Sequence, residues 1–360
     1  MAKGAYIGVG GKARKIKKAY IGVGGVARPC WTGGEAAYYG TATALSVDRY
    51  DLAAASVGNY ALFGGGESID FQSVVDAYNT SLVRSNPTEL RYAVSNLAAT
   101  SVGGYALFAG GRDYDADYDE SNPYSTVNAY NASLIQSLPT RMGVAKFSHA
   151  ATSVGNYAIF AGGRQDSSLL NHASSYDTSL AMGVPTSLSS ARYELAATSV
   201  GNYALFGGGY SSSNSAVVDA YNTSLTHSIP TALSAARRQL AATSVGNYAL
   251  FAGGYVKGQS EYLNTVDAYD TSLTRSTPTT LSAGRSELVA ITVNGRAFFA
   301  GGVTGVNAQS VVDVYDDSLT RTTTTSLSYA RYDLAATSVG NYALFGGGYY
   351  TDTVDAYIVS

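Results

Sequence analysis

Short runs of alternating apolar and polar residues recur along this chain, in pairs separated by a two-residue break. The clearest pair lies in Leu240–Gly254, where LAATSV and YALFA flank Gly246-Asn247. Alternation with period 2 predicts half-buried β-strands, and a Gly-Asn break predicts a tight hairpin turn. The sixth copy has Asn294-Gly295 at the break, which suits the same turn. The copies begin at Leu52, Leu97, His149, Leu195, Leu240, Leu288 and Leu334.

The spacing of these copies predicts the architecture. Successive copies start 45 to 48 residues apart, with one interval stretched to 52 between the second and third. Each copy ends in a Gly doublet or triplet, and a variable loop, a third run such as Val266–Tyr269 and a TSL segment follow. A fixed period in this range is typical of propellers and solenoids. Seven repeats of four strands predict an all-β fold, a seven-bladed β-propeller of four-stranded antiparallel blades.

The two ends of the repeat region complement each other. The last repeat stops at Ser360 after three strands, whereas Ala36–Ser46 matches the fourth-strand segment Thr271–Ser282 of the fifth unit. We therefore predict that the N-terminal strand completes the last blade, because closing the ring removes exposed sheet edges. This divides the chain into a propeller over residues 36–360 and a short N-terminal extension over residues 1–35.

The Gly-Gly pair and the tyrosine that follows it resemble the kelch repeat. Examples are Gly253-Gly254 with Tyr269, and Gly110-Gly111 with Tyr130. The resemblance covers roughly residues 36–360 and implies a propeller, a fold that hosts enzymes and adaptors alike. The tryptophan usual in the fourth kelch strand is absent. Leucines stand near its place, at Leu82, Leu134, Leu180, Leu225, Leu273 and Leu319.

The N-terminal extension contains the motif AYIGVGG twice, at residues 5–11 and 19–25, with a basic linker over residues 12–18. Its alternating apolar positions predict a short strand that would add to the edge of another sheet; a disordered basic arm is the alternative. The duplicated motif resembles N-terminal segments of bacteriophage and prophage structural proteins, which implies other virion proteins as partners. The candidate assembly residues are Tyr6, Ile7, Tyr20, Ile21 and Trp31.

Strand polarity predicts which segments share a face. If the innermost strand runs from face one to face two, the loops after the glycines and the segments entering the innermost strands meet on face one. Those loops vary most between repeats, and a recurring triplet such as Arg192-Tyr193-Glu194 enters the innermost strand. We expect ligands to bind there. The candidate ligand-binding residues are Arg49, Tyr50, Arg192, Tyr193, Arg237, Arg285, Arg331 and Tyr332 of the triplets, and Tyr114, Tyr118, Tyr210, Tyr255 and Tyr349 of the loops.

The recurring arginines have two interpretations. Each could pair with a neighbouring carboxylate and tie the blades together, since a motif repeated in most blades is usually structural. The resemblance to kelch adaptors, which use basic residues at this position for ligands, implies a binding role instead. The second and third repeats depart from the motif, with Val94-Ser95-Asn96 and Lys146-Phe147-Ser148.

Composition and charge exclude several classes of function. Residues 1–35 carry seven Lys/Arg and one acid, which leaves 16 basic against 25 acidic residues, or −9, on the remainder. This net negative charge on residues 36–360 argues against nucleic acid as the main partner. The one cysteine, Cys30, cannot form an internal disulfide, and no apolar run is long enough to insert into a membrane.

The sequence offers little catalytic chemistry. The histidines His149, His172 and His227 belong to different parts of the repeats, and His149 replaces a strand leucine, which favours packing. A histidine-based triad or zinc site therefore lacks support, and we expect neither enzyme activity nor a cofactor. Asp113, Asp115 and Asp117 alternate in one loop and form a weak calcium candidate, with a solvated acidic loop as the alternative.

These features predict a bacteriophage or prophage virion component made in the host cytoplasm. The propeller would be a non-catalytic head that binds a host-surface protein or glycan, and the N-terminal segment would be the assembly anchor. The alternative is a cytoplasmic kelch-type scaffold for protein–protein interaction, followed by a propeller enzyme. The sequence leaves open whether the chain forms homo-oligomers.

Overall fold

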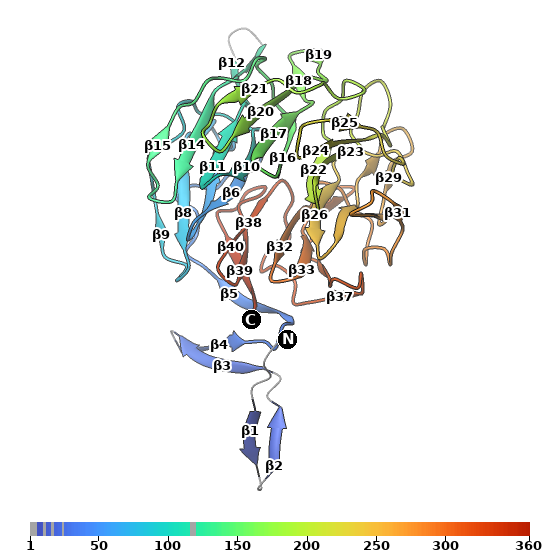
Figure 1. The fold of residues 1–360 in the computed structure, drawn as a ribbon. Helices are drawn as coiled ribbons and strands as arrows, with labels where there is room; N and C mark the ends of the chain where they lie inside the picture. Colours follow the sequence, from blue (N-terminus) through green and yellow to red (C-terminus); the bar gives the residue numbers. More distant parts are fainter. Residues whose placement is uncertain (1–5, 10–11, 16–17, 24, 116–119) are drawn as a thin grey trace.

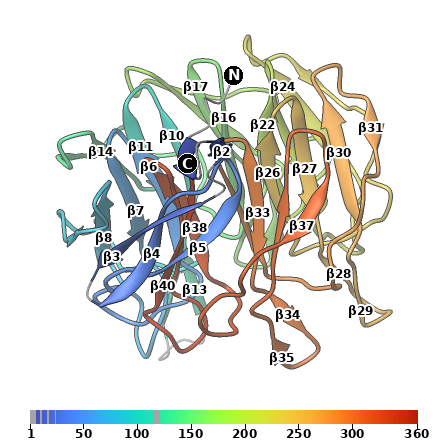
Figure 2. The same cartoon turned by 90° about the horizontal axis from the view of Figure 1, so that it is seen from below.

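The protein is a ring of seven four-stranded antiparallel sheets around a central axis, as expected (Figures 1 and 2). This computed structural model describes residues 6–9, 12–15, 18–23, 25–115 and 120–360. In these ranges every regular element is a β-strand, and no helix is long and apolar enough to cross a membrane.

The first four blades follow the chain, each from the axis outward. They comprise β6 (Ala53–Val57), β7 (Tyr60–Gly64), β8 (Val75–Asn79) and β9 (Arg84–Ser85); β10 (Ala98–Val102), β11 (Tyr105–Ala109), β14 (Val127–Asn131) and β15 (Gln136–Ser137); β16 (Ala150–Val154), β17 (Tyr157–Ala161), β20 (Ala173–Asp177) and β21 (Met182–Gly183); and β22 (Ala196–Val200), β23 (Tyr203–Gly207), β24 (Val218–Asn222) and β25 (His227–Ser228).

The last three blades follow the same order, except that the outermost strand of blade 7 comes from the N-terminus. They comprise β26 (Ala241–Val245), β27 (Tyr248–Ala252), β30 (Val266–Asp270) and β31 (Arg275–Ser276); β32 (Val289–Val293), β33 (Arg296–Ala300), β36 (Val312–Tyr315) and β37 (Arg321–Thr323); and β38 (Ala335–Val339), β39 (Tyr342–Gly346), β40 (Val354–Val359) and β5 (Ala36–Thr41).

Strand β5 closes the ring, which confirms the predicted N-terminal lock. It runs antiparallel to β40, with Tyr38 opposite Tyr357 and Thr41 opposite Asp355. The Tyr38 hydroxyl donates a hydrogen bond of 2.8 Å to the Asp355 carboxylate, and its ring lies edge-on against Tyr357. Blade 7 is thereby built from both ends of the chain.

Small residues line the axis, where the innermost strands crowd together. The second residue of each innermost strand is alanine in all seven blades, as at Ala54 and Ala242, and the fourth is serine or, in β32, Thr292. Bulky side chains point instead between the blades. Leu62 and Val75 of blade 1, for example, pack against Phe108 and Tyr130 of blade 2.

Each blade is also tied to its predecessor by a tyrosine of the third strand. The ring of Tyr269 is fully buried, and its hydroxyl donates to the carbonyl oxygen of Thr231, which leads out of blade 4. All seven blades repeat this bond, which satisfies the polar end of an otherwise apolar side chain. The donors are Tyr78, Tyr130, Tyr176, Tyr221, Tyr269, Tyr315 and Tyr357.

The turns between strands follow the sequence pattern. Asn294 and Gly295 both have positive φ, at 45° and 73°, as the reversed break requires. The leucines that stand near the missing kelch tryptophan, such as Leu82, lie in the turn before the fourth strand rather than in it, with φ near 60°. In that turn the Asn79 side chain accepts hydrogen bonds from the amides of Ser81 and Val83.

Four variable loops carry short hairpins of their own. These are β12 (Arg112–Asp115) with β13 (Glu120–Pro123), β18 (Arg164–Gln165) with β19 (Ser168–Leu169), β28 (Tyr255–Val256) with β29 (Glu261–Tyr262), and β34 (Val303–Thr304) with β35 (Asn307–Ala308). They belong to blades 2, 3, 5 and 6 and follow the Gly-Gly pairs of those blades on face one; in Figure 2, β13, β28, β29, β34 and β35 lie toward the bottom of the picture.

The extension forms two hairpins beside blade 7, below the ring in Figure 1. The predicted strands exist as β1 (Tyr6–Val9) and β3 (Ala19–Val23), but each pairs with the segment that follows it, β2 (Lys12–Lys15) and β4 (Val26–Trp31). The second hairpin is fastened to the propeller: the amides of Thr32 and Gly34 donate to the Ser360 carbonyl, at 3.3 and 2.8 Å. Each copy of the motif thus pairs one edge of its strand with the segment that follows it.

Candidate binding face around the channel mouth

The three residues of the recurring triplet have three separate environments. The first is buried inside its blade, the second lies on the rim of face one, and the third faces the channel along the axis. The three side chains point in different directions because the third residue takes a left-handed backbone conformation in every blade. The sequence analysis had placed the first two residues of the triplet together at one ligand site.

The first triplet residue forms a buried ion pair within its own blade. In blade 5 the Arg237 guanidinium donates to the Asp267 carboxylate at 2.8 Å and to the Phe251 carbonyl at 3.1 Å, and both charged side chains have no exposed surface. Arg49, Arg192, Arg285 and Arg331 make the same pair with Asp76, Asp219, Asp313 and Asp355, at 2.6 to 2.9 Å.

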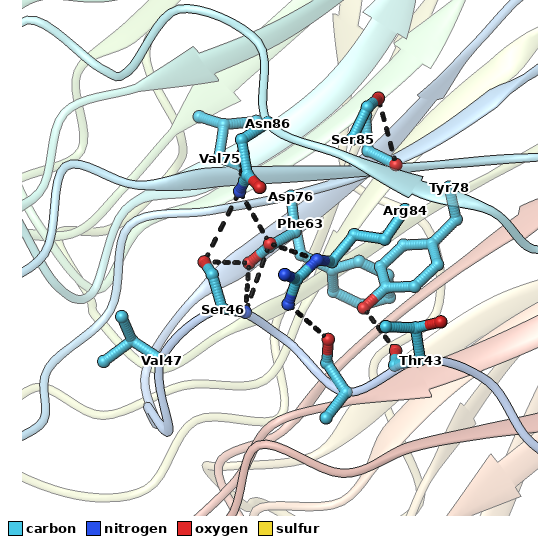
Figure 3. A network of polar contacts seen from close by, with 12 residues as sticks. Thr43, Ser46, Val47, Phe63, Val75, Asp76, Tyr78, Arg84, Ser85 and Asn86 are labelled. Atoms are coloured by element: carbon cyan, nitrogen blue, oxygen red, sulfur yellow. Dashed lines mark hydrogen bonds and ion pairs between the residues drawn. The ribbon is translucent and has the colours of Figure 1, made fainter.

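The carboxylates of these pairs also hold the segment that arrives from the previous blade. Figure 3 shows the network in blade 1, where Asp76 accepts hydrogen bonds from the amide and hydroxyl of Ser46 and from Asn86, and forms an ion pair with Arg84 at 3.6 Å. Because Ser46 follows the outermost strand of blade 7, the carboxylate joins two blades. A carboxylate with this many donors is well compensated for its burial.

This arrangement corrects the prediction that Arg49, Arg192, Arg237, Arg285 and Arg331 bind a ligand. Their relative exposures are 0 to 1%, so their guanidinium groups have no surface to offer. Each of these arginines instead forms an ion pair with a carboxylate, as the alternative interpretation proposed. The partner is an aspartate of the third strand and not the acid of the triplet itself.

The third triplet residues close a ring of backbone hydrogen bonds around the channel mouth. The amide of Asn96 donates to the Asp51 carbonyl at 3.0 Å, that of Ser148 to Asn96 at 2.9 Å, and so on through all seven blades until Asp51 donates to Asp333 at 3.0 Å. Their φ values lie between 51° and 55°. The seven members are Asp51, Asn96, Ser148, Glu194, Gln239, Glu287 and Asp333.

Four carboxylates of this ring line a cavity of about 210 Å³ at the channel mouth. Burial raises the pKa of Asp51 to about 6 and that of Glu287 to about 7, and repulsion from the neighbouring acids adds to the shift at Glu287. Burial likewise raises the pKa of Asp333 and Glu194, the latter opposed by Arg238. The mouth is an acidic cup, opposite in sign to the basic mouth expected from the sequence.

The raised pKa values predict a pH-dependent stability. A carboxyl whose pKa is higher in the folded state stabilises the fold below its unfolded pKa, and this contribution is lost as pH rises from about 4 to 7. The double variant Glu287→Gln, Asp333→Asn should be more stable than the wild type, by a difference that grows by on the order of 1–2 kcal/mol between pH 5 and pH 8, allowing for partial solvent screening.

The chain itself supplies the precedent for this variant, since Gln239 and Asn96 occupy the same ring positions. Urea unfolding at pH 5, 6, 7 and 8 measures the difference. A difference that does not change with pH would contradict the assignment of repulsion to these two groups.

Around the acidic cup runs a belt of stacked aromatic and cationic side chains, here called the rim belt. It consists of Arg112, Phe147, Arg164, Tyr193, Tyr210, Arg238 and Tyr255 on blades 2 to 5, and Tyr332, Tyr349 and Tyr50 on blades 7 and 1. Members of the belt join the triplet segment to the loop after the glycines, as Tyr193 pairs with Tyr210 and Arg238 with Tyr255.

The contacts along the belt are short enough for cation–π attraction. The Arg164 guanidinium lies 5.1 Å from the centre of the Phe147 ring and 5.4 Å from that of Tyr193. Arg238 lies 5.1 Å from Tyr210 and also pairs with Glu194 of the cup at 3.0 Å. Across blade 6 the belt is interrupted, because Ser286 and Val303 occupy the two positions.

Six of the predicted tyrosines therefore meet in one belt: Tyr50, Tyr193, Tyr210, Tyr255, Tyr332 and Tyr349. Tyr114 lies on β12 and is exposed. Tyr118 and Asp117 lie outside the described residues. Sequence reasoning missed Arg112, Arg164 and Arg238, although the first two follow a Gly-Gly pair at the position that holds tyrosine in three other repeats.

The remaining predicted site residues are placed as follows. Tyr20 and Ile21 of the second hairpin are 59% and 54% exposed, which leaves them accessible to an assembly partner. Tyr6, Ile7 and Trp31 lie on β1 and β4. Asp113 accepts a hydrogen bond of 2.7 Å from Tyr124. In the described part of the chain, no three acidic, histidine or cysteine side chains converge as a metal site.

Comparisons with known proteins bear on the fold alone. No family model and no curated protein matches this chain. Among solved structures, the one titled "Structure of YjhT" is 12% identical and has a TM-score of 0.64, with 79% of this chain and 99% of that chain covered. At this identity the likeness supports the propeller architecture and carries no activity or ligand with it.

Proposed function

We propose that this protein is a non-catalytic binding protein of a bacteriophage or prophage virion, with the propeller as its head. The observation that supports this proposal best is the rim belt: nine half-buried side chains with flat aromatic or guanidinium faces, together with the buried ring of Phe147, lie around one acidic cup on the face whose loops vary most between repeats. Stacked and half-buried side chains are pre-organised, so little conformational entropy is lost on binding.

The position of the N-terminal hairpins supports the same proposal. They join the propeller beside blade 7 (Figure 1), where Thr32 binds Ser360 just after β40, at the end of that strand away from the loop between β39 and β40. An anchor at one end leaves the belt directed away from the assembly. Exposed Tyr20, Ile21 and Val26 give the anchor an apolar surface for another virion protein.

A host-surface glycan fits the belt and the cup best. Aromatic faces stack on the apolar face of a sugar ring, while carboxylates such as Glu287 accept hydrogen bonds from its hydroxyls. A host-surface protein is a second candidate ligand, because tyrosine and arginine are the residues that dominate protein interfaces. A cytoplasmic scaffold would use the same face, and it would leave the exposed hairpins without a role.

The test is binding of the purified full chain to bacterial cell-wall and surface polysaccharide. Replacing Tyr210 and Tyr255 together by Ala should weaken binding at least tenfold, since each aromatic anchor contributes on the order of 2 kcal/mol. Substituting Ala for Asn202 and Asn247, in the turns of the opposite face, is the matched control and should leave affinity unchanged. Full affinity in the tyrosine variant, with loss in the control, would place the site on the wrong face.

A further inference from the structure

Blade 3 contains a buried cation without the carboxylate that its counterparts have. Lys146 occupies the arginine position, and its ammonium donates to the Phe160 carbonyl at 2.9 Å and to the His172 carbonyl at 3.1 Å. Phe160 is equivalent to the phenylalanine whose carbonyl accepts a hydrogen bond from the buried arginine in other blades, such as Phe251 with Arg237. The cation therefore has the same place and one of the same acceptors, with 0% exposure.

The acceptor side of this blade has changed in a different way. The third-strand residue that is aspartate in five blades is Ser174 here; it is fully buried, and its Oγ has no hydrogen-bond partner among the described residues. The outer donor to that carboxylate, His227 in blade 4 and Arg275 in blade 5, is replaced by Met182. Blade 2 has lost both charges together, with Val94 and Asn128. Among the seven blades, blade 3 alone keeps the cation and lacks the anion.

Two histidines face the same region and do not supply the missing charge. His149 is 7% exposed and its two ring nitrogens have no partner among the described residues; its pKa is lowered by burial and by Lys146. His172 has a lowered pKa for the same two reasons. Burial lowers the pKa of Lys146 to about 7, so the ammonium form lacks compensation near neutral pH. No carboxylate is described among the contacts of Lys146.

We propose that a small monovalent anion, of the size of chloride or formate, binds between the Lys146 ammonium and the Ser174 hydroxyl. It occupies the position that the aspartate carboxylate has in the other blades. Serine has two heavy atoms fewer than aspartate, so a small ion is the size of group that would replace the missing part of the carboxylate. Gly143 stands where Ser46 binds the carboxylate in blade 1, so that donor is missing too, and the ring of His172 lies against Gly143.

Bromide, which substitutes for chloride and scatters anomalously, is the direct probe. Crystals of the full chain soaked in sodium bromide should show one anomalous peak within about 3.3 Å of both Lys146 Nζ and Ser174 Oγ, the distance of an N–H or O–H donor to a halide. In solution, the melting temperature at pH 6.5 should rise by roughly 1 °C for each tenfold increase in chloride, with gluconate holding the ionic strength constant.

The variant Ser174→Asp supplies the carboxylate and should abolish both the bromide peak and the chloride dependence while melting at a higher temperature. Lys146→Met removes the cation and should also abolish both, which keeps the test decisive if Ser174→Asp does not fold. A chloride dependence that survives in either variant, or a bromide-soaked crystal without a peak at this position, would overturn the proposal.

Discussion

A chain that begins at Ser46 should lose at least about 5 kcal/mol of stability relative to the full-length protein. Without β5, the outward backbone groups of β40 lose their partners, at about 1 kcal/mol for each hydrogen bond. The buried side chains of Ile358 and Val359 become exposed to water as well, and each contributes about 1–2 kcal/mol on burial. The bond from Tyr38 to Asp355 disappears, so the Arg331–Asp355 pair loses a donor.

The matched control is a chain that begins at Thr32, which removes both hairpins and keeps β5. It should melt within a few degrees of the full-length protein, because the contacts of Thr32 and Gly34 with Ser360 remain. Thermal unfolding followed by far-ultraviolet circular dichroism compares the three chains. Equal melting temperatures for the Ser46 and Thr32 chains would refute the role of β5 as the lock.

The architecture was predictable because its determinants are local and repeated. Alternation within Leu240–Gly254, a turn at each break and glycines after each second strand fix the strand order without long-range information. The pairing of β5 with β40 followed from the count of strands at the two ends. The pairing within the N-terminal hairpins was missed, because the basic residues of β2 resemble a solvated linker rather than a strand.

The sequence indicated which segments share face one, but it did not indicate where each side chain of those segments points. The sequence places the backbone of Arg237 near the channel mouth on face one. The side chain of an arginine is long enough to turn back into its blade, where it forms an ion pair with Asp267. The signal for this was present: aspartate accompanies arginine in five repeats, and both change together in repeats 2 and 3. The acidic cup was missed because the left-handed conformation that turns Glu287 and its counterparts toward the axis involves residues other than glycine.

The same co-variation predicts the cost of breaking one pair. Asp267→Asn should destabilise the protein by about 3–5 kcal/mol, because it leaves Arg237 buried without a counter-charge. Burial already lowers the pKa of Arg237, which shows how strongly its environment disfavours an isolated charge. Arg275, at 3.1 Å from the same carboxylate, loses its partner too, although its side chain is 27% exposed and can be solvated.

Adding Arg237→Val to Asp267→Asn should recover most of that loss, because the double variant copies blade 2. There Val94 and Asn128 occupy the two positions, and the side-chain Oδ1 of Asn128 accepts a hydrogen bond from the backbone amide of Arg91 at 2.9 Å. The equivalent bond in blade 5 runs from the backbone amide of Ser234 to Asp267. A buried pair replaced by a neutral one is commonly close to neutral in stability, whereas half a pair is not. Urea unfolding of both single variants and the double variant gives the coupling free energy, expected at 2 kcal/mol or more in magnitude. If the double variant were as unstable as Asp267→Asn alone, the stabilising interaction would belong to the aspartate and its backbone donors, and the buried arginine would need another explanation.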